Sequence, residues 1–171
     1  KAVTQCWPDT DQQRCWVHKI ANVMEKLPKA MQPKVKEALH NIWQAETREK
    51  AYKAFDNCIE RFSPKYPKAM ECLAKDKDSM LAFYDYPAEN WQHIRTTNPV
   101  ESVFATVRLR TAKTKNCGSR MTTLTMAFKL MEVAQKKWFR LRGYKLLADV
   151  VQGVKFVNGV KQNGDRKQVA A

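Results

Sequence analysis

One carboxylate, Glu101, stands in the most basic part of this sequence. Residues 95–145 carry 12 Lys and Arg against 2 acids, so +10 of the chain's net charge of +14 lies in this stretch. A carboxylate in a basic groove would repel phosphate unless it held a divalent metal, which is the arrangement expected for phosphodiester chemistry. Arg108, seven residues later, shares the helical face of Glu101. Glu101 is therefore a candidate metal-ligating and catalytic residue.

The segment around Glu101 also has a purely structural interpretation. Thr96-Thr97-Asn98-Pro99-Val100-Glu101 has the pattern of a helix start, with a polar cap and Pro99 at the first helical position. Asn98 and Glu101 have the spacing of a capping box, in which the glutamate satisfies a backbone N–H. The local pattern favours this role, and the basic surroundings favour the catalytic one.

A set of basic side chains surrounds this segment and suits contacts to phosphate. The set consists of Arg95, Arg108, Arg110, Lys113, Lys115 and Arg120. A solvated helix face is the alternative, although such a face ordinarily mixes both signs of charge. With this charge balance, nucleic acid is the expected partner. Trp91, just upstream, could stack on an unpaired base, but core packing is the commoner role of such a residue.

Cys15-x-x-His18 is a second candidate for chemistry, because it has the spacing of half a zinc site. No second pair with suitable spacing follows, so a buried Cys at a strand end, with His18 opening a helix, is the favoured interpretation. The five cysteines are odd in number and scattered, which indicates a reducing compartment and predicts a cytoplasmic protein. No apolar run is long enough to span a bilayer. The sequence starts without Met or a signal peptide, so we expect a piece of a longer protein.

The elements that position these residues are mostly helical. Residues 13–17 have the composition of a short strand, and apolar spacing then predicts helices ending at Pro28, beginning near Pro33, and following Thr47 as N-cap. Residues 66–84 predict one long or two short helices. The clearest pattern is a helix from Met121 to Leu141, ended by Gly143. A short helix and a loosely ordered tail should follow.

Three segments together resemble one known family. They are Gln13-Arg14-Cys15-Trp16-Val17-His18-Lys19, then Phe83-Tyr84-Asp85-Tyr86-Pro87-Ala88-Glu89-Asn90-Trp91, then Arg95-Thr96-Thr97-Asn98-Pro99-Val100-Glu101-Ser102. In order and spacing they resemble the C-terminal half of Mutator-like transposases of bacterial insertion sequences. The resemblance covers residues from about Trp7 to Gly143.

The resemblance implies an Asp-Asp-Glu (DDE) transposase with a ribonuclease-H-like core and a helical insertion. It maps the third catalytic carboxylate, a Mg²⁺ ligand, onto Glu101, and it maps family signature positions of unassigned role onto Cys15, His18, Trp91 and Asn98. The implied partners are transposon-end and target DNA, with a homo-oligomer in the full-length enzyme. The implied division is the end of the core strand region (1–19), the insertion (20–94), basic core helices (95–143) and a tail (144–171), in a mainly α chain.

The sequence departs from the family pattern in one respect. The two family aspartates should lie upstream of Lys1, and neither Asp9 nor Asp11 takes their place. We therefore expect this chain to be inactive by itself, with a non-catalytic helical DNA-binding or protein-interaction fragment as the alternative.

Overall fold

The structure is a computed structural model that describes residues 2–8, 10–114 and 118–162. These residues are mainly helical, as the sequence predicts. They divide into two compact units. The first unit contains residues 1–96 and 143–171, and the second contains residues 97–142.

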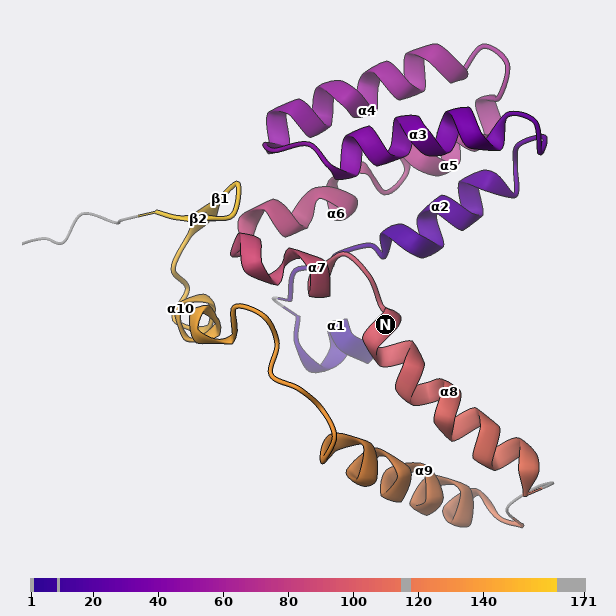
Figure 1. Ribbon diagram of the computed structural model, residues 1–171, viewed down its shortest axis with the longest axis vertical. Coiled ribbons are helices and arrows are strands. Elements are labelled where there is room, and N and C mark those ends of the chain that lie inside the picture. Colours follow the sequence, from indigo (N-terminus) through magenta and orange to yellow (C-terminus); the bar gives the residue numbers. More distant parts are fainter. Residues whose placement is uncertain (1, 9, 115–117, 163–171) are drawn as a thin grey trace, which may run out of the picture. The chain divides into compact units, whose positions relative to one another are not determined.

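The first unit is built from short and medium helices that follow one another along the chain (Figure 1). They are α1 (Ala2–Cys6), α2 (Trp16–Met24), α3 (Gln32–Trp43), α4 (Arg48–Phe62), α5 (Pro67–Ala74), α6 (Lys77–Leu81), η1 (Ala82–Asp85), η2 (Ala88–Asn90) and α7 (Trp91–Ile94). The predicted helix near Pro33 and the helix after Thr47 correspond to α3 and α4. Where the sequence predicts one long or two short helices over residues 66–84, the structure has three short ones, α5, α6 and η1.

The core of this unit is the shared apolar face of α2 to α6. Its fully buried side chains include Trp16, Val23, Val35, Leu39, Ile42, Phe55, Met70, Leu73, Met80 and Leu81. Trp16 also has a polar atom to satisfy, and its indole N–H donates to the carbonyl oxygen of Met80 at 2.9 Å. Burying this apolar face is the main stabilising contribution, since isolated helices of this length are marginal in water.

Side-chain caps mark the starts of two helices, α4 and α9 (Arg120–Gln135). The Thr47 side chain accepts a hydrogen bond from the Lys50 N–H and starts α4, as predicted. Ser119 does the same for α9, where it accepts from the Thr122 N–H at 3.1 Å.

The predicted strand at residues 13–17 is wrong. Helix α2 already begins at Trp16, and residues 10–15 form no strand. The polar groups of this segment bond instead to the α6–η1 region: the Arg14 N–H donates to the Ser79 carbonyl at 2.7 Å, and the Gln13 amide bridges Met80 and Phe83. Trp16 is buried in the core while Val17 is exposed, and the aromatic and β-branched composition of this segment does not distinguish this arrangement from strand pairing.

The C-terminal segment also differs from the loosely ordered tail that the sequence suggests. After η3 (Tyr144–Leu146) and α10 (Leu147–Val151), strands β1 (Phe156–Val157) and β2 (Val160–Lys161) pair as an antiparallel hairpin. Asn158 and Gly159 have φ values of 50° and 81°, the left-handed pair that a type I′ turn requires. The Asn-Gly pair was the sequence signal for this hairpin. Residues 163–171 lie outside the described residues.

The hairpin is fastened to the helices of the first unit. The Gly159 N–H donates to the Tyr84 carbonyl at 3.2 Å, and the Gly159 carbonyl accepts from the Ala88 N–H at 3.1 Å. The Asn158 side chain accepts from the Arg48 N–H at 2.8 Å, which satisfies a free donor at the start of α4. Phe156 is buried.

The second unit contains α8 (Asn98–Lys113) packed against α9. Helix α9 ends at Gln135, so Trp138 and Leu141 lie beyond it, and the predicted helix to Leu141 is too long. Of the apolar side chains whose spacing predicts α9, Met121 is 72% and Phe128 59% exposed. On α8, Val107 is buried and Phe104 is exposed. The periodicity identified helices correctly but did not show what covers their apolar faces.

Candidate functional site

Glu101 lies in the first turn of α8, and its side chain is half-buried. The Thr97 hydroxyl donates a hydrogen bond to Oε1 of Glu101 at 2.6 Å, and the Glu101 N–H donates to the Thr97 carbonyl at 3.0 Å. An anionic side chain is favoured at this position because the N-terminus of a helix carries partial positive charge. The carboxylate is thus held by a neighbour on its own chain segment.

The predicted capping box does not match the observed helix start. Helix α8 begins at Asn98, so Thr97 is the N-cap and Glu101 is four residues after it rather than three. Pro99 is the second helical residue rather than the first. The Thr97 side chain donates to the carboxylate instead of accepting from a backbone N–H. The side chain of Asn98 lies outside the described residues.

The predicted basic residues of α8 do not all share the face of Glu101. Seven residues correspond to about two turns, so Arg108 lies on nearly the same face, about 10 Å along the axis. Arg110 is nine residues away, which places it on roughly the opposite face. Both are exposed, as are Lys113 and Arg120, and no ion pair with an acid joins any of these four within the part of the chain that the structure describes. Lys115 lies outside that part.

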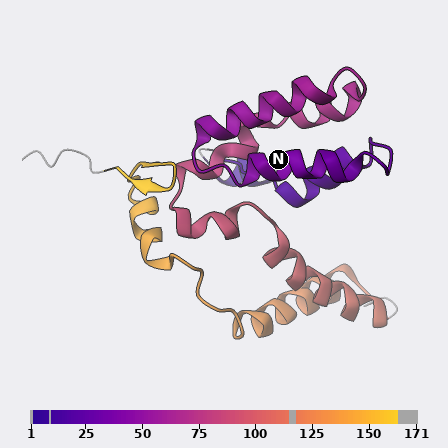
Figure 2. The same ribbon diagram turned by 45° about the horizontal axis from the view of Figure 1, so that its top comes forward.

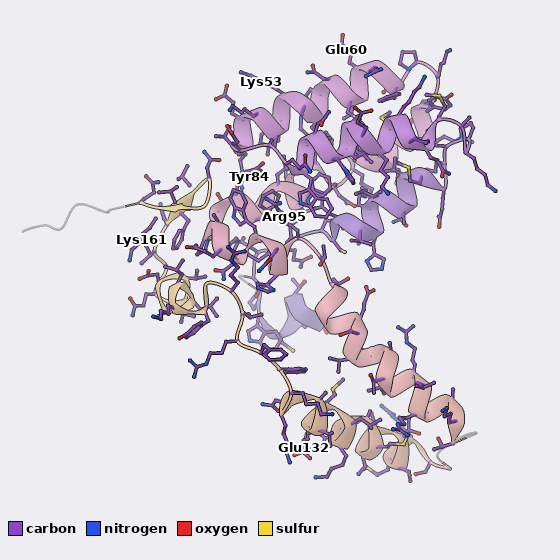
Figure 3. The ribbon with its side chains drawn as sticks, in the orientation of Figure 1. Lys53, Glu60, Tyr84, Arg95, Glu132 and Lys161 are labelled. Carbon is purple, nitrogen blue, oxygen red and sulfur yellow. The ribbon has the colours of Figure 1, made fainter. Side chains whose placement is uncertain are left out.

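Arg95 belongs to the first unit and is held against aromatic rings rather than presented to solvent. Its guanidinium carbon lies 4.1 Å from the ring centre of Phe83 and 4.8 Å from that of Trp91. Its Nε is buried, and burial lowers the pKa of Arg95 from its ordinary value. Figure 3 shows Arg95 near Tyr84 in this aromatic cluster. The geometry gives Arg95 a packing role.

Trp91 is the centre of the same cluster. Its ring lies edge-on to Phe83 and Tyr84, with ring centres 5.1 Å apart in both cases. Its indole N–H donates to the Tyr86 carbonyl at 2.8 Å. These contacts favour core packing over base stacking, the two alternatives left open by the sequence.

The Cys15-x-x-His18 pair spans the start of α2. Cys15 is buried directly before the helix, while His18 is exposed in its first turn. No group of three His, Cys, Asp or Glu side chains suited to a metal occurs among the described residues. A buried cysteine before a helix matches the favoured interpretation, except that no strand precedes it.

Comparison with known proteins gives the family. The family described as "Transposase, Mutator family" matches residues 1–140, which is most of the chain. The chain belongs to the Mutator family of transposases.

Two proteins similar to this Mutator-family chain are named transposases of insertion sequences. It is 49% identical over 173 residues to "Transposase for insertion sequence element IST2" of Acidithiobacillus ferrooxidans, covering 99% of this chain and 58% of the relative. It is 47% identical over 159 residues to "Transposase for insertion sequence element IS6120" of Mycolicibacterium smegmatis, covering 93% and 49%. The chain therefore spans about half the length of these relatives.

Two side-chain contacts of this Mutator-family chain were not predicted from the sequence. One is Thr97, whose hydroxyl contacts Glu101; a hydroxyl residue one helical turn before an acid was the available signal. The other is Asp76, which pairs with buried Lys19 at 2.7 Å and with Arg14 at 3.3 Å, and whose partners lie too far along the chain for a sequence pattern to show.

Among the described residues, no helix combines the length and apolar character needed to cross a bilayer.

Proposed function

We propose that this chain is the C-terminal part of a DDE transposase of a bacterial insertion sequence, which cleaves DNA strands at the element's ends and transfers them to target DNA. Membership of the Mutator family over residues 1–140 supports this proposal. The observation that supports the proposal most directly is the position of the acid in α8. Thr97 holds Glu101 in the first helical turn, and Arg108 follows on nearly the same face.

In this proposal Glu101 is the third catalytic carboxylate and a Mg²⁺ ligand. Magnesium in proteins needs near-octahedral oxygen coordination, usually from more than one carboxylate together with waters and substrate. No group of three His, Cys, Asp or Glu side chains suited to a metal occurs among the described residues, so they do not form a magnesium site by themselves. We therefore assign no catalytic step to this chain alone and propose that it is inactive without the rest of the enzyme.

The proposed partner is DNA, both at the transposon ends and at the target. We also propose that the full-length enzyme forms a homo-oligomer. Arg108, Arg110, Lys113, Lys115 and Arg120 would contact phosphates by charge. Because the cations of α8 lie around its circumference, they suit a backbone that runs past the helix more than a single pocket on the face of Glu101.

The test is strand cleavage by the full-length transposase carrying Glu101→Gln, a change that keeps the shape and removes the charge. We expect cleavage to fall by at least about 100-fold with DNA binding retained, as for loss of a charged group acting at the reaction centre. Glu132→Gln is the matched control, because Glu132 is the other acid of the second unit and pairs with Lys129 on the same helix. Unchanged cleavage by the Glu101 variant would leave this residue with a structural role only.

The second candidate is a non-catalytic helical fragment that binds DNA or another protein. The exposed apolar side chains of α9 favour a protein-interaction role. DNA affinity that hardly changes with salt would support this alternative and contradict phosphate contacts.

A further inference from the structure

The helices of the first unit bring two basic turns to one end of a bundle. Helices α2 and α3 are joined by residues 25–31, and α4 and α5 are joined by residues 63–66. Helices α3 and α4 pack together, and α5 packs on both α2 and α4. In Figures 1 and 2 both turns lie at the same end of this bundle, away from the α3–α4 connection.

We call this region the basic end and define it as residues 26–34 and 61–68. It carries six cations and no acid: Lys26, Lys29, Lys34, Arg61, Lys65 and Lys68. All six side chains are exposed. Glu25 and Glu60 flank it, so the segments 25–34 and 60–68 together keep a net charge of +4.

The pairing of charges separates the basic end from the rest of the bundle. Toward the other end, Lys50 pairs with Glu46, Lys53 pairs with Glu49 at 2.7 Å, and Arg48 pairs with Asp85 at 2.6 Å. For the six cations of the basic end, no ion pair with an acid exists in residues 2–8, 10–114 and 118–162. Figure 3 marks Lys53 toward the paired end and Glu60 toward the basic end of α4.

Helix dipoles do not explain this surface, since α2 and α4 end here while α3 and α5 begin here. Their partial charges largely offset one another, so the side chains determine the local potential. A solvated surface that serves only solubility usually mixes both signs of charge, as the paired end does. Six exposed cations at one end of the bundle, with no acid among them, instead repel one another unless a polyanion is present.

We propose that the basic end is a second DNA-contacting surface, which binds the phosphate backbone of duplex DNA without reading its sequence. The proposal rests on the proposed DNA-binding function but uses residues outside the second unit. Flexible lysines on turns suit phosphate contacts, which position a duplex, more than base contacts, which require fixed geometry. The surface extends the DNA footprint of this chain beyond Arg108 and its neighbours.

The experiment measures the affinity of this chain for a short fluorescent duplex of arbitrary sequence, between about 50 and 200 mM salt. The test variant is Lys29→Gln/Lys65→Gln, with one change in each turn. The matched control is Lys50→Gln/Lys53→Gln, which removes the same charge from exposed positions at the paired end. Loss of two phosphate contacts should reduce the slope of log affinity against log salt by about 1.8 and weaken low-salt binding roughly tenfold. The control should change affinity by less than about twofold with the slope retained.

Equal effects of the two double variants, or a stronger preference of the chain for a polyglutamate competitor than for the duplex, would overturn the proposal. Arg108→Gln/Arg110→Gln distinguishes it from the proposed function. If this variant weakens binding while the basic-end variant matches the control, only the second surface is refuted. If the basic-end variant alone weakens binding, the second surface stands and the DNA-contact role of α8 fails.

Discussion

The Thr97 hydroxyl donates to the Glu101 carboxylate at 2.6 Å, and the Glu101 N–H donates to the Thr97 carbonyl at 3.0 Å. Both bonds span one helical turn, so the residue that precedes α8 also orients the acid in its first turn. A carboxylate that keeps one orientation spends less conformational entropy on binding a ligand than a freely rotating one.

Thr97→Val in the full-length transposase should therefore reduce DNA cleavage roughly tenfold, the size of effect seen when the partner of a metal-ligating group is removed. Thr97→Ser keeps the hydroxyl and should restore most of the activity. Thr96→Val, one residue earlier, is the control for a general effect on the helix start. Equal activity of the Val and Ser variants would show that the hydrogen bond does not position the acid.

Alanine substitutions of Arg95 and Arg108 should affect different properties, although both residues belong to the predicted DNA-binding set. The first should lower stability and the second should weaken DNA binding. Arg95→Ala removes a guanidinium stacked on Phe83 and Trp91, so we expect a loss of about 1–2 kcal/mol in the free energy of unfolding. Arg108→Ala alters an exposed side chain and should leave stability within about 0.5 kcal/mol. Urea unfolding checks these values.

Duplex binding by the same two variants completes the comparison. The salt slope should fall by about 0.9 for the Arg108 variant and stay constant for the Arg95 variant. If Arg95→Ala reduced the salt slope and left the stability at the wild-type value, Arg95 would be a DNA-contacting residue after all.

The Asp76 carboxylate links stability to pH. Its hydrogen bond to Lys19 holds the pKa of Asp76 below its ordinary value of 3.8. Because the pKa is lowered on folding, the stabilisation is complete above the ordinary value and is lost as pH falls through the lowered pKa. Unfolding free energies measured from pH 7 downward should therefore decline below about pH 4.

Asp76→Asn should remove much of this dependence and cost about 3 kcal/mol at pH 7, since it leaves the ammonium of buried Lys19 without its charge partner. Asp56→Asn is the control, because Asp56 is an exposed acid that pairs with Lys77. A similar small cost for both variants would mean that Lys19 is adequately hydrated.

The hairpin turn offers a matched pair of glycines. Gly159 and Gly153 have φ values of 81° and 75°, so alanine is strained at both positions. A Cβ at Gly159 would lie 2.6 Å from Cβ of Ala88 and 2.8 Å from the Trp91 ring, whereas Gly153 has open space. Gly153→Ala should cost about 1 kcal/mol, and Gly159→Ala at least about 2 kcal/mol more. Thermal unfolding of both variants measures the difference, and equal costs would show that the hairpin does not press on Trp91.

Local sequence patterns were sufficient to predict much of the secondary structure. Thr47 starts a helix because its side chain caps it, and the spacing of Val35, Leu39 and Ile42 specifies a buried face whatever that face packs against. The residues and order of three segments, 13–19, 83–91 and 95–102, were likewise enough to indicate the Mutator family. The cap and the apolar spacing depend on residues within a few positions of one another, and the order of the three segments is itself a property of the sequence. Sequence patterns therefore report these features directly.

Other outcomes required the tertiary structure. The role of Arg95 depends on Phe83, and the pairing of Lys19 depends on Asp76, a residue 57 positions away. The apolar spacing of α9 predicts a helix, yet Met121, Leu124 and Phe128 on it are exposed, because periodicity records a face and not its partner. The two segments of the basic end, residues 26–34 and 61–68, are 27 positions apart in the sequence at their nearest. The sequence by itself determined the helices, the family and the candidate acid, whereas only packing between distant segments decided which charges are buried, paired or left exposed.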